Sequence, residues 1–74
     1  MAKVIIEKGK QKRVESGHPW VFKNEVSEIQ GDYNPGDIVD VYNFKDRFIG
    51  RGYINPKSQI LVRIMTRDIG EQID

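Results

Sequence analysis

Cysteine is absent from the sequence, and only one histidine occurs among its 74 residues. Without cysteine the chain cannot be a disulfide-stapled secreted mini-protein, and one imidazole without a thiol cannot hold a structural zinc ion. The apolar run near the start, residues 4–6, is too short for a signal peptide or a membrane span, and Lys8 soon follows it. We therefore expect a cytoplasmic protein.

The composition and length exclude several classes of protein. Hydrophobic residues make up 38% of the chain and charged residues 31%, which is too apolar for a disordered tail and too charged for a membrane protein. A chain of 74 residues is one small domain or a fragment, which excludes most self-sufficient enzymes. Such a chain buries only about 60% of its unfolded surface, so a closed or well-covered sheet is expected to hold it together.

The net charge of +1 is an average over blocks of opposite sign. Residues 1–23 carry a net charge of +4 and residues 47–67 carry +5, whereas residues 24–46 carry −5 and residues 68–74 carry −3. If the fold brings the two basic blocks together, one face becomes basic and is suited to a polyanion. The alternative is that these cations lie on solvated strand edges, where they discourage aggregation.

The first residues predict a strand and then a short helix. Residues 4–6 are β-branched and favour a strand. Residues 10–16 are mainly good helix formers and are followed by Gly17, which is typical of a helix C-terminus. We expect one or two helical turns, with Val14 alone facing the core.

An aromatic segment follows the helix. Trp20 and Phe22 share one face of an extended stretch and are large enough to anchor a small core. Val26 and Ile29 follow without clean alternation, which predicts an irregular strand or a bulge.

Turn signals at a spacing near ten residues divide the remainder of the chain. Residues 34–37, Asn-Pro-Gly-Asp, have the sequence of a type II turn, and further turns are expected at residues 45–46 and 55–58. The strands predicted between them cover residues 38–42, 48–54 and 60–65. This spacing indicates a mainly β fold, a small barrel or roll.

Alternation along residues 48–54 sorts the side chains onto two faces. Gly50 and Gly52 share one face, which predicts a bent strand or a close backbone neighbour. Ile49, Arg51 and Tyr53 share the other face, where a cation beside an aromatic can hold a phosphate and stack a base. The alternative is that Tyr53 caps the core and Arg51 pairs with an acid. We favour the core for Tyr53 and a functional role for Arg51.

No arrangement of residues indicates catalysis. Ser16 and His18 are near neighbours, but nucleophile, base and orienting group must converge in space, so a loop histidine that bonds the backbone or contacts a ligand is the favoured interpretation. A metal site is not expected, and Gly50 and Gly52 lack the third glycine of a dinucleotide fingerprint. Asn55 is expected to satisfy its own turn rather than to contact phosphate or sugar.

Four segments of the sequence together resemble a known family. They are Arg13 with residues 17–22 (Gly-His-Pro-Trp-Val-Phe), residues 36–41, residues 48–56, and residues 57–63, which open with Lys-Ser-Gln. In that order and spacing they are similar to the N-terminal PUA domain of the bacterial class I S-adenosylmethionine-dependent methyltransferases that modify cytosine C5 in 23S ribosomal RNA. The resemblance covers residues 4–67, and residues 68–74 resemble the opening of the family's next domain, cut short.

The resemblance implies a PUA-like pseudobarrel of about five or six strands with one or two short helices over residues 1–67, and a linker over residues 68–74. It implies structured ribosomal RNA as the partner, no membrane and no metal, and S-adenosylmethionine as the cofactor of the full-length protein. The family's catalytic cysteine lies in a later domain, so no catalysis carries over to this chain. The alternative is a domain that docks on its linked methyltransferase domain through Trp20 or Tyr53, with little RNA contact. The residues implied to contact RNA are Lys12, Arg13, Ser16, Gly17 and His18, with Arg51, Lys57 and Arg63 as supporting cations.

Overall fold

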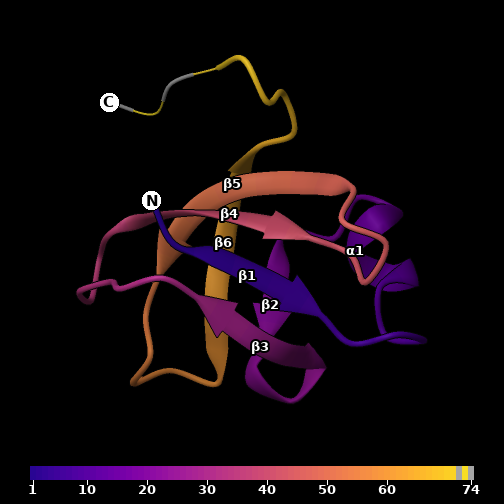
Figure 1. The fold of residues 1–74 in the computed structure, drawn as a ribbon, viewed down its shortest axis with the longest axis horizontal. Helices are drawn as coiled ribbons and strands as arrows, with labels where there is room; N and C mark the ends of the chain where they lie inside the picture. The colour runs from indigo at the N-terminus through magenta and orange to yellow at the C-terminus, as the bar shows by residue number, and fades with distance from the viewer. Residues whose placement is uncertain (72, 74) are drawn as a thin grey trace.

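The computed structural model describes residues 1–71 and 73 and, within them, arranges six strands in a single curled sheet (Figure 1). The strands neighbour one another in the order β2-β6-β5-β4-β1-β3. β1 and β4 run parallel, and the other neighbouring pairs are antiparallel. In chain order the elements are β1 Lys3–Ile6, α1 Lys12–Glu15, β2 Trp20–Phe22, the 3₁₀ turn η1 Lys23–Glu25, β3 Val26–Gln30, β4 Ile38–Tyr42, β5 Phe48–Ile54 and β6 Ile60–Thr66.

The core fills the concave face of this curled sheet. Along β4, buried Val39 and Val41 alternate with half-buried Ile38, Asp40 and Tyr42, as expected for a strand with one face in the core. The largest fully buried side chains are all β-branched: Ile6, Ile54, Val4, Val14, Val21, Val39, Val41 and Val62. Such side chains pack well on a pleated surface. The six strands and the short helix confirm the predicted mainly β pseudobarrel.

The short helix α1 touches the core through a single residue, as predicted. Val14 is fully buried, and the other residues of the helix are exposed or half-buried. Gly17 has a φ of 116° and ends the turn, with its N–H donating to the carbonyl of Val14 at 3.1 Å. The helix has one turn, within the one or two turns predicted, and before it the Gln11 side chain accepts a hydrogen bond from the Gly9 N–H at 2.8 Å.

The prediction that Trp20 and Phe22 anchor the core is wrong. Trp20 is 39% exposed, and the residue between the two aromatics, Val21, is fully buried opposite Val62 of β6. Because side chains alternate along a strand, burial of Val21 turns both aromatics outward. On that outer side Trp20 and Phe22 meet edge to face, with ring centroids 6.4 Å apart.

The two glycines of β5 allow a close approach between backbones, as predicted. A Cβ on Gly52 would overlap the carbonyl oxygen of Arg63 and lie 2.7 Å from its carbonyl carbon. A Cβ on Gly50 would lie 2.7 Å from Cγ2 of Ile64 and 3.1 Å from the carbonyl oxygen of Thr66. The bend of β5 over β6, visible in Figure 1, therefore requires residues without side chains at both positions.

The predicted alternation along residues 48–54 fails at Ile49. Val41 pairs with Gly50 and Tyr42 pairs with Phe48, so Ile49 is an extra residue on β5. A bulge of this kind changes the direction of the side chains next to it, and Ile49 is buried at 7% exposure instead of facing outward with Arg51.

The predicted turns and the irregular strand are confirmed. Gly36 has a φ of 89°, and the Asp37 N–H donates to the carbonyl of Asn34 at 3.0 Å, consistent with a type II turn. β3 pairs with β1 through a register shift between Ile5 and Ile6.

Candidate nucleic-acid interface

The segment from α1 to β2 contains five of the predicted RNA-contacting residues and is held by its own hydrogen bonds. The Ser16 hydroxyl donates to the carbonyl of Lys12 at 2.6 Å, and the His18 N–H donates to the carbonyl of Arg13 at 3.3 Å. No atom lies within 4 Å of the position that a Cβ on Gly17 would take. This segment is therefore exposed, fixed in shape and open to close approach at Gly17.

Arg67, which the sequence analysis did not select, fastens this segment to the end of β6. Its guanidinium donates to the carbonyl of Val14 at 2.6 Å and to the carbonyl of His18 at 2.9 Å. Burial lowers the pKa of Arg67 from its ordinary value, but the group stays charged at neutral pH because that value is so high. Its position two residues after the last predicted strand was the available signal, since a cation there can bond exposed backbone carbonyls.

His18 is the predicted loop histidine that bonds the backbone. Its Nδ1 accepts a hydrogen bond from the Trp20 N–H at 3.3 Å, and its ring meets Trp20 edge to face with centroids 5.7 Å apart. Because Nδ1 is the acceptor, the neutral ring carries its proton on Nε2. Nε2 is then available as a hydrogen-bond donor to a ligand.

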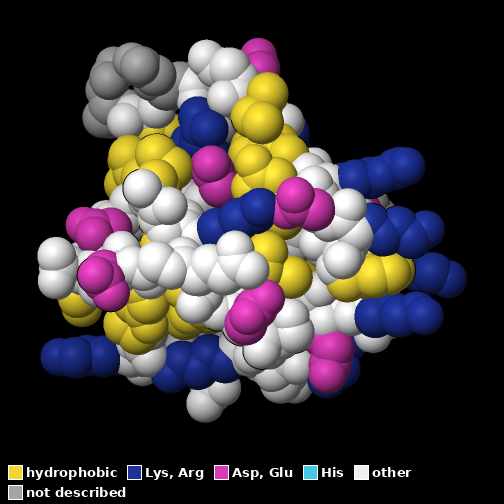
Figure 2. Space-filling view, viewed as in Figure 1, with side chains coloured by type: hydrophobic (Ala, Val, Ile, Leu, Met, Phe, Trp, Pro, Cys, Tyr) yellow, Lys and Arg dark blue, Asp and Glu magenta, His cyan; other side chains and the backbone are white. Residues whose placement is uncertain are grey.

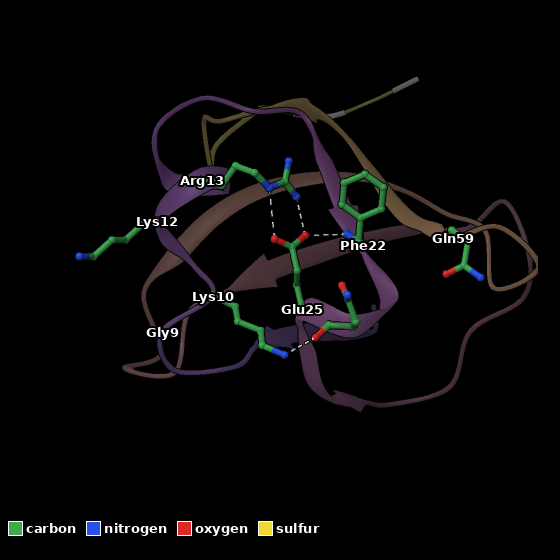
Figure 3. Close-up of a pocket in the computed structure, with 8 residues that line it drawn as sticks. Gly9, Lys10, Lys12, Arg13, Phe22, Glu25 and Gln59 are labelled. Atoms are coloured by element: carbon green, nitrogen blue, oxygen red, sulfur yellow. Dashed lines mark hydrogen bonds and ion pairs between the residues drawn. The ribbon is translucent and has the colours of Figure 1, made fainter.

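Arg13 joins α1 to β2 and η1 (Figure 3). Its Nε and Nη2 donate to the two carboxylate oxygens of Glu25 at 3.3 and 2.5 Å, and Nη2 also donates to the carbonyl of Trp20 at 2.9 Å. The same carboxylate accepts the Phe22 N–H at 2.8 Å, and the guanidinium lies 4.9 Å from the centre of the Phe22 ring. These contacts give Arg13 a structural role, and its contact with RNA stays a prediction.

An open groove of about 510 Å³ borders this ion pair. Across it from Arg13, Gln59 of the β5–β6 connection forms the other side, while the Lys12 side chain extends away into solvent (Figure 3). The Lys10 ammonium donates to the carbonyl of Asn24 at 2.9 Å and pairs with Glu7 at 3.0 Å. Lys12, in contrast to Lys10 and Arg13, has no ion pair within the described residues and extends into solvent.

Arg51 pairs with an acid, which is the alternative that the sequence analysis did not favour. Its Nε donates to Asp40 Oδ1 at 2.6 Å across the β4–β5 pair, and Nη1 donates to the carbonyl of Glu71 at 2.6 Å. The hydrogen bond to Asp40 raises the pKa of Arg51 from its ordinary value. Arg51 and Arg13 share no partner, so the structure gives no contact that joins them into one basic face.

Arg63 and Lys57 lie on the β6 side of the molecule. Arg63 is opposite Trp20 on β2 and opposite Tyr53 on β5, so it stands between two aromatic side chains on the outer face. Tyr53 is half-buried and lines a small recess with Arg63 rather than standing beside Arg51 alone. In the turn that carries Lys57, Asn55 Oδ1 accepts the Lys57 N–H at 3.2 Å, as expected for an asparagine that satisfies its own turn.

The charged side chains separate into a paired set and an unpaired set. Within residues 1–71 and 73, ion pairs engage Lys3 with Asp46, Lys10 with Glu7, Arg13 with Glu25, and Arg51 with Asp40. In the same residues, the cations with neither a carboxylate partner nor a side-chain hydrogen bond are Lys8, Lys12, Lys23, Lys45, Arg47, Lys57 and Arg63. In Figure 2, Lys and Arg side chains project from the end of the molecule where α1 lies in Figure 1.

The two basic blocks of the sequence do meet, but not through Arg51. β2, from the first block, pairs with β6, from the second, and the Lys23 N–H donates to the carbonyl of Gln59 at 3.0 Å. Arg63 lies opposite Trp20 of this edge strand, Lys57 lies in the β5–β6 connection that also carries Gln59, and Lys12 lines the groove that Phe22 and Gln59 border. We call the set Lys12, Gly17, His18, Lys57 and Arg63 the β2 edge surface.

The described residues hold neither a group of metal ligands nor a membrane-spanning helix. Residues 1–71 and 73 contain no cluster of three or more His, Cys, Asp or Glu side chains that could hold a metal ion. No helix in this part of the chain has the length and apolarity needed to cross a membrane.

Comparison with known proteins gives consistent matches. The model of the PUA-like domain family matches residues 4–67. "Ribosomal RNA large subunit methyltransferase I" from Pseudoalteromonas atlantica is 40% identical over 73 residues, and the protein of the same name from Salmonella arizonae is 36% identical over 72 residues. These alignments cover 99% and 97% of this chain but only 18% of each relative.

Proposed function

Since the chain belongs to the PUA-like domain family, we propose that it is an RNA-binding module that presents structured ribosomal RNA to a methyltransferase domain of the same protein. Its relatives are named for methylation of large-subunit ribosomal RNA, and the chain spans 18% of their length. The reaction therefore belongs to the part of the protein outside this chain. We further propose cytosine C5 as the target atom, the cytoplasm as the location, and S-adenosylmethionine as the methyl donor, bound by that other domain.

Residues 68–74 lead into that domain in our proposal. The Asp68 N–H donates to Thr66 Oγ1 at 3.1 Å, and Glu71 receives the hydrogen bond from Arg51 described above, so the tail leaves β6 close to the β4–β5 pair. Gln72 and Asp74 lie outside the described residues.

The observation that carries the proposal is the unpaired charge of the β2 edge surface. Lys12 and Arg63 have no carboxylate partner in the described part of the chain, so phosphates would not have to displace one. Gly17 offers space for a sugar–phosphate backbone, and His18 Nε2 offers a donor to a phosphate or a 2′-hydroxyl. Shape and backbone contacts of this kind suit a structured RNA better than a particular base sequence.

The test of this proposal is a salt titration of RNA binding. We expect the double variant Lys12→Gln and Arg63→Gln to bind a structured RNA more weakly, and the slope of log affinity against log salt to fall by roughly two units, about one per lost phosphate contact. Filter binding over a salt series measures both quantities. The matched control is Lys3→Gln, which removes a cation already paired with Asp46 and should leave the slope unchanged. A flat salt slope for the parent chain, or no binding at low salt, would overturn the proposal.

Charge reversal at Arg13 or Arg51 is not a clean test of RNA binding. Each guanidinium bonds a carboxylate and a backbone carbonyl, so reversing either charge places two acids against each other. Loss of binding in such a variant would follow from loss of structure.

A second candidate function is docking on the linked methyltransferase domain, which Trp20 and Met65 favour. They are 39% and 55% exposed, and they lie on the outer side of β2 and β6 with Arg63 between them in register. Under this alternative, Lys12→Gln and Arg63→Gln leave RNA binding unchanged. In the full-length protein, Trp20→Ser would instead increase the susceptibility of the junction after Arg67 to protease.

A further inference from the structure

The turn between β4 and β5 presents an aromatic side chain where small polar residues are usual. Phe44 is 38% exposed at the tip of this turn, and turn positions more often hold Gly, Asn or Asp. The ammonium groups of Lys8 and Lys45 each lie 5.7 Å from the centre of its ring. Neither lysine has a carboxylate partner among residues 1–71 and 73. An exposed ring with two unpaired cations close to it is therefore a distinct feature of this surface.

The turn that carries this ring is bonded to α1 through Asn43. Asn43 is only 6% exposed, and its Oδ1 accepts the N–H groups of Lys45 and Arg47 at 2.9 and 3.0 Å. Its Nδ2 donates to Glu15 Oε2 of α1 at 2.9 Å. Figure 1 shows the β4–β5 connection beside α1. The turn that carries Phe44 is thus bonded to the helix that also carries Lys12.

We propose that Phe44 is a stacking platform for an unpaired base of the bound RNA, with Lys8 and Lys45 on the phosphates that flank this base. The inference rests on the proposed function and narrows the substrate to an RNA with an unpaired nucleotide, in a loop or a bulge, next to its duplex.

The chemistry of the site favours a nucleotide as the ligand. An aromatic side chain stacks on any base, because each base has a π face. The two ammonium groups attract phosphate. A base that stacks on the ring displaces one flexible lysine, which then contacts the phosphate of the same nucleotide. An apolar protein surface would instead have to bury two charged groups without partners, which is costly.

The experiment compares Phe44→Ala with the parent 74-residue chain on two probes, a hairpin RNA with an unpaired loop and a blunt RNA duplex of the same length. We expect Phe44→Ala to lower the affinity for the hairpin by roughly 5- to 150-fold, the range found when a base-stacking aromatic is removed. The affinity for the duplex should not change. Phe44→Trp should restore hairpin binding, and Met65→Ala, which also removes an exposed apolar side chain, should have no effect.

Each result separates this inference from the proposed function. If Phe44→Ala binds the hairpin as well as the parent chain does, while the Lys12 and Arg63 variant binds weakly, the stacking platform is wrong and the RNA-binding function stands. Equal losses on hairpin and duplex would also contradict stacking, because a duplex offers no unpaired base. A parent chain that binds neither probe overturns the proposed function, and with it this inference.

Discussion

The Gly52→Ala variant is expected to lose about 3–5 kcal/mol of folding free energy, because the added methyl group meets the backbone of β6. The overlapping atom is the carbonyl oxygen of Arg63, which cannot move aside as a side chain would without breaking the β5–β6 pairing. A domain of this length has only roughly 4–11 kcal/mol of stability in total. The variant should therefore lose a large fraction of its stability and unfold at a clearly lower temperature than the parent chain, which thermal unfolding followed by circular dichroism measures.

The matched control for Gly52 is Gly70→Ala. A Cβ on Gly70 would meet Asp68 Oδ1 at 3.4 Å, an ordinary contact, so we expect a change within about 0.5 kcal/mol. If Gly52→Ala were as stable as this control, the close approach of β5 and β6 would be disproved.

The second large effect is expected from Arg13→Ala, which should cost about 2 kcal/mol because the half-buried Glu25 carboxylate loses its guanidinium. Glu25 keeps only the Phe22 N–H of the hydrogen bonds described above. Arg13→Lys should recover only part of the loss, since an ammonium cannot bond both carboxylate oxygens and the Trp20 carbonyl in the same planar arrangement. Urea unfolding of each variant gives these free energies.

A double-mutant cycle with Glu25→Gln isolates this interaction. We expect a coupling energy of about 1–2 kcal/mol between the two positions, and almost none between Glu25 and Lys12, whose side chain extends into solvent. Full stability of Arg13→Ala combined with loss of RNA binding would contradict the structural role and favour the direct phosphate contact that the sequence implied.

Local sequence signals predicted most of the strands in this molecule. The turn residues around Gly36 and Asn55 mark ends of β4, β5 and β6. The bounds predicted for β5 are those observed. The close approach at Gly50 and Gly52 could also be predicted from the sequence, because two glycines on one face of a strand leave room for a neighbouring backbone. In each case the residues that determine the feature lie within a few positions of it in the sequence.

The features that were predicted incorrectly, or missed, depend on contacts between distant segments. The size of Trp20 favoured a core position, but the pairing of Val21 with Val62 decides which face of β2 is buried. The partner of Arg51 depends on the register of β4 against β5, and a bulge at Ile49 shifts that register. Lys8 and Phe44 are far apart in the sequence, and the hydrogen bond from Asn43 to Glu15 fixes the turn that brings them together. No local pattern contains this information.

The parallel pairing of β1 with β4 has a consequence for synthesis of the chain. β1 is made before the other strands of this sheet, yet it lies between β4 and β3 and, within the described residues, is the only sheet neighbour of β3. A ribosome must therefore release residues beyond Tyr42 before β1 can gain both partners, whereas β4, β5 and β6 can pair as consecutive hairpins. A nascent chain that stalls before this point would hold its first strand without its β4 neighbour, so elongation rate sets how long that edge stays accessible to chaperones.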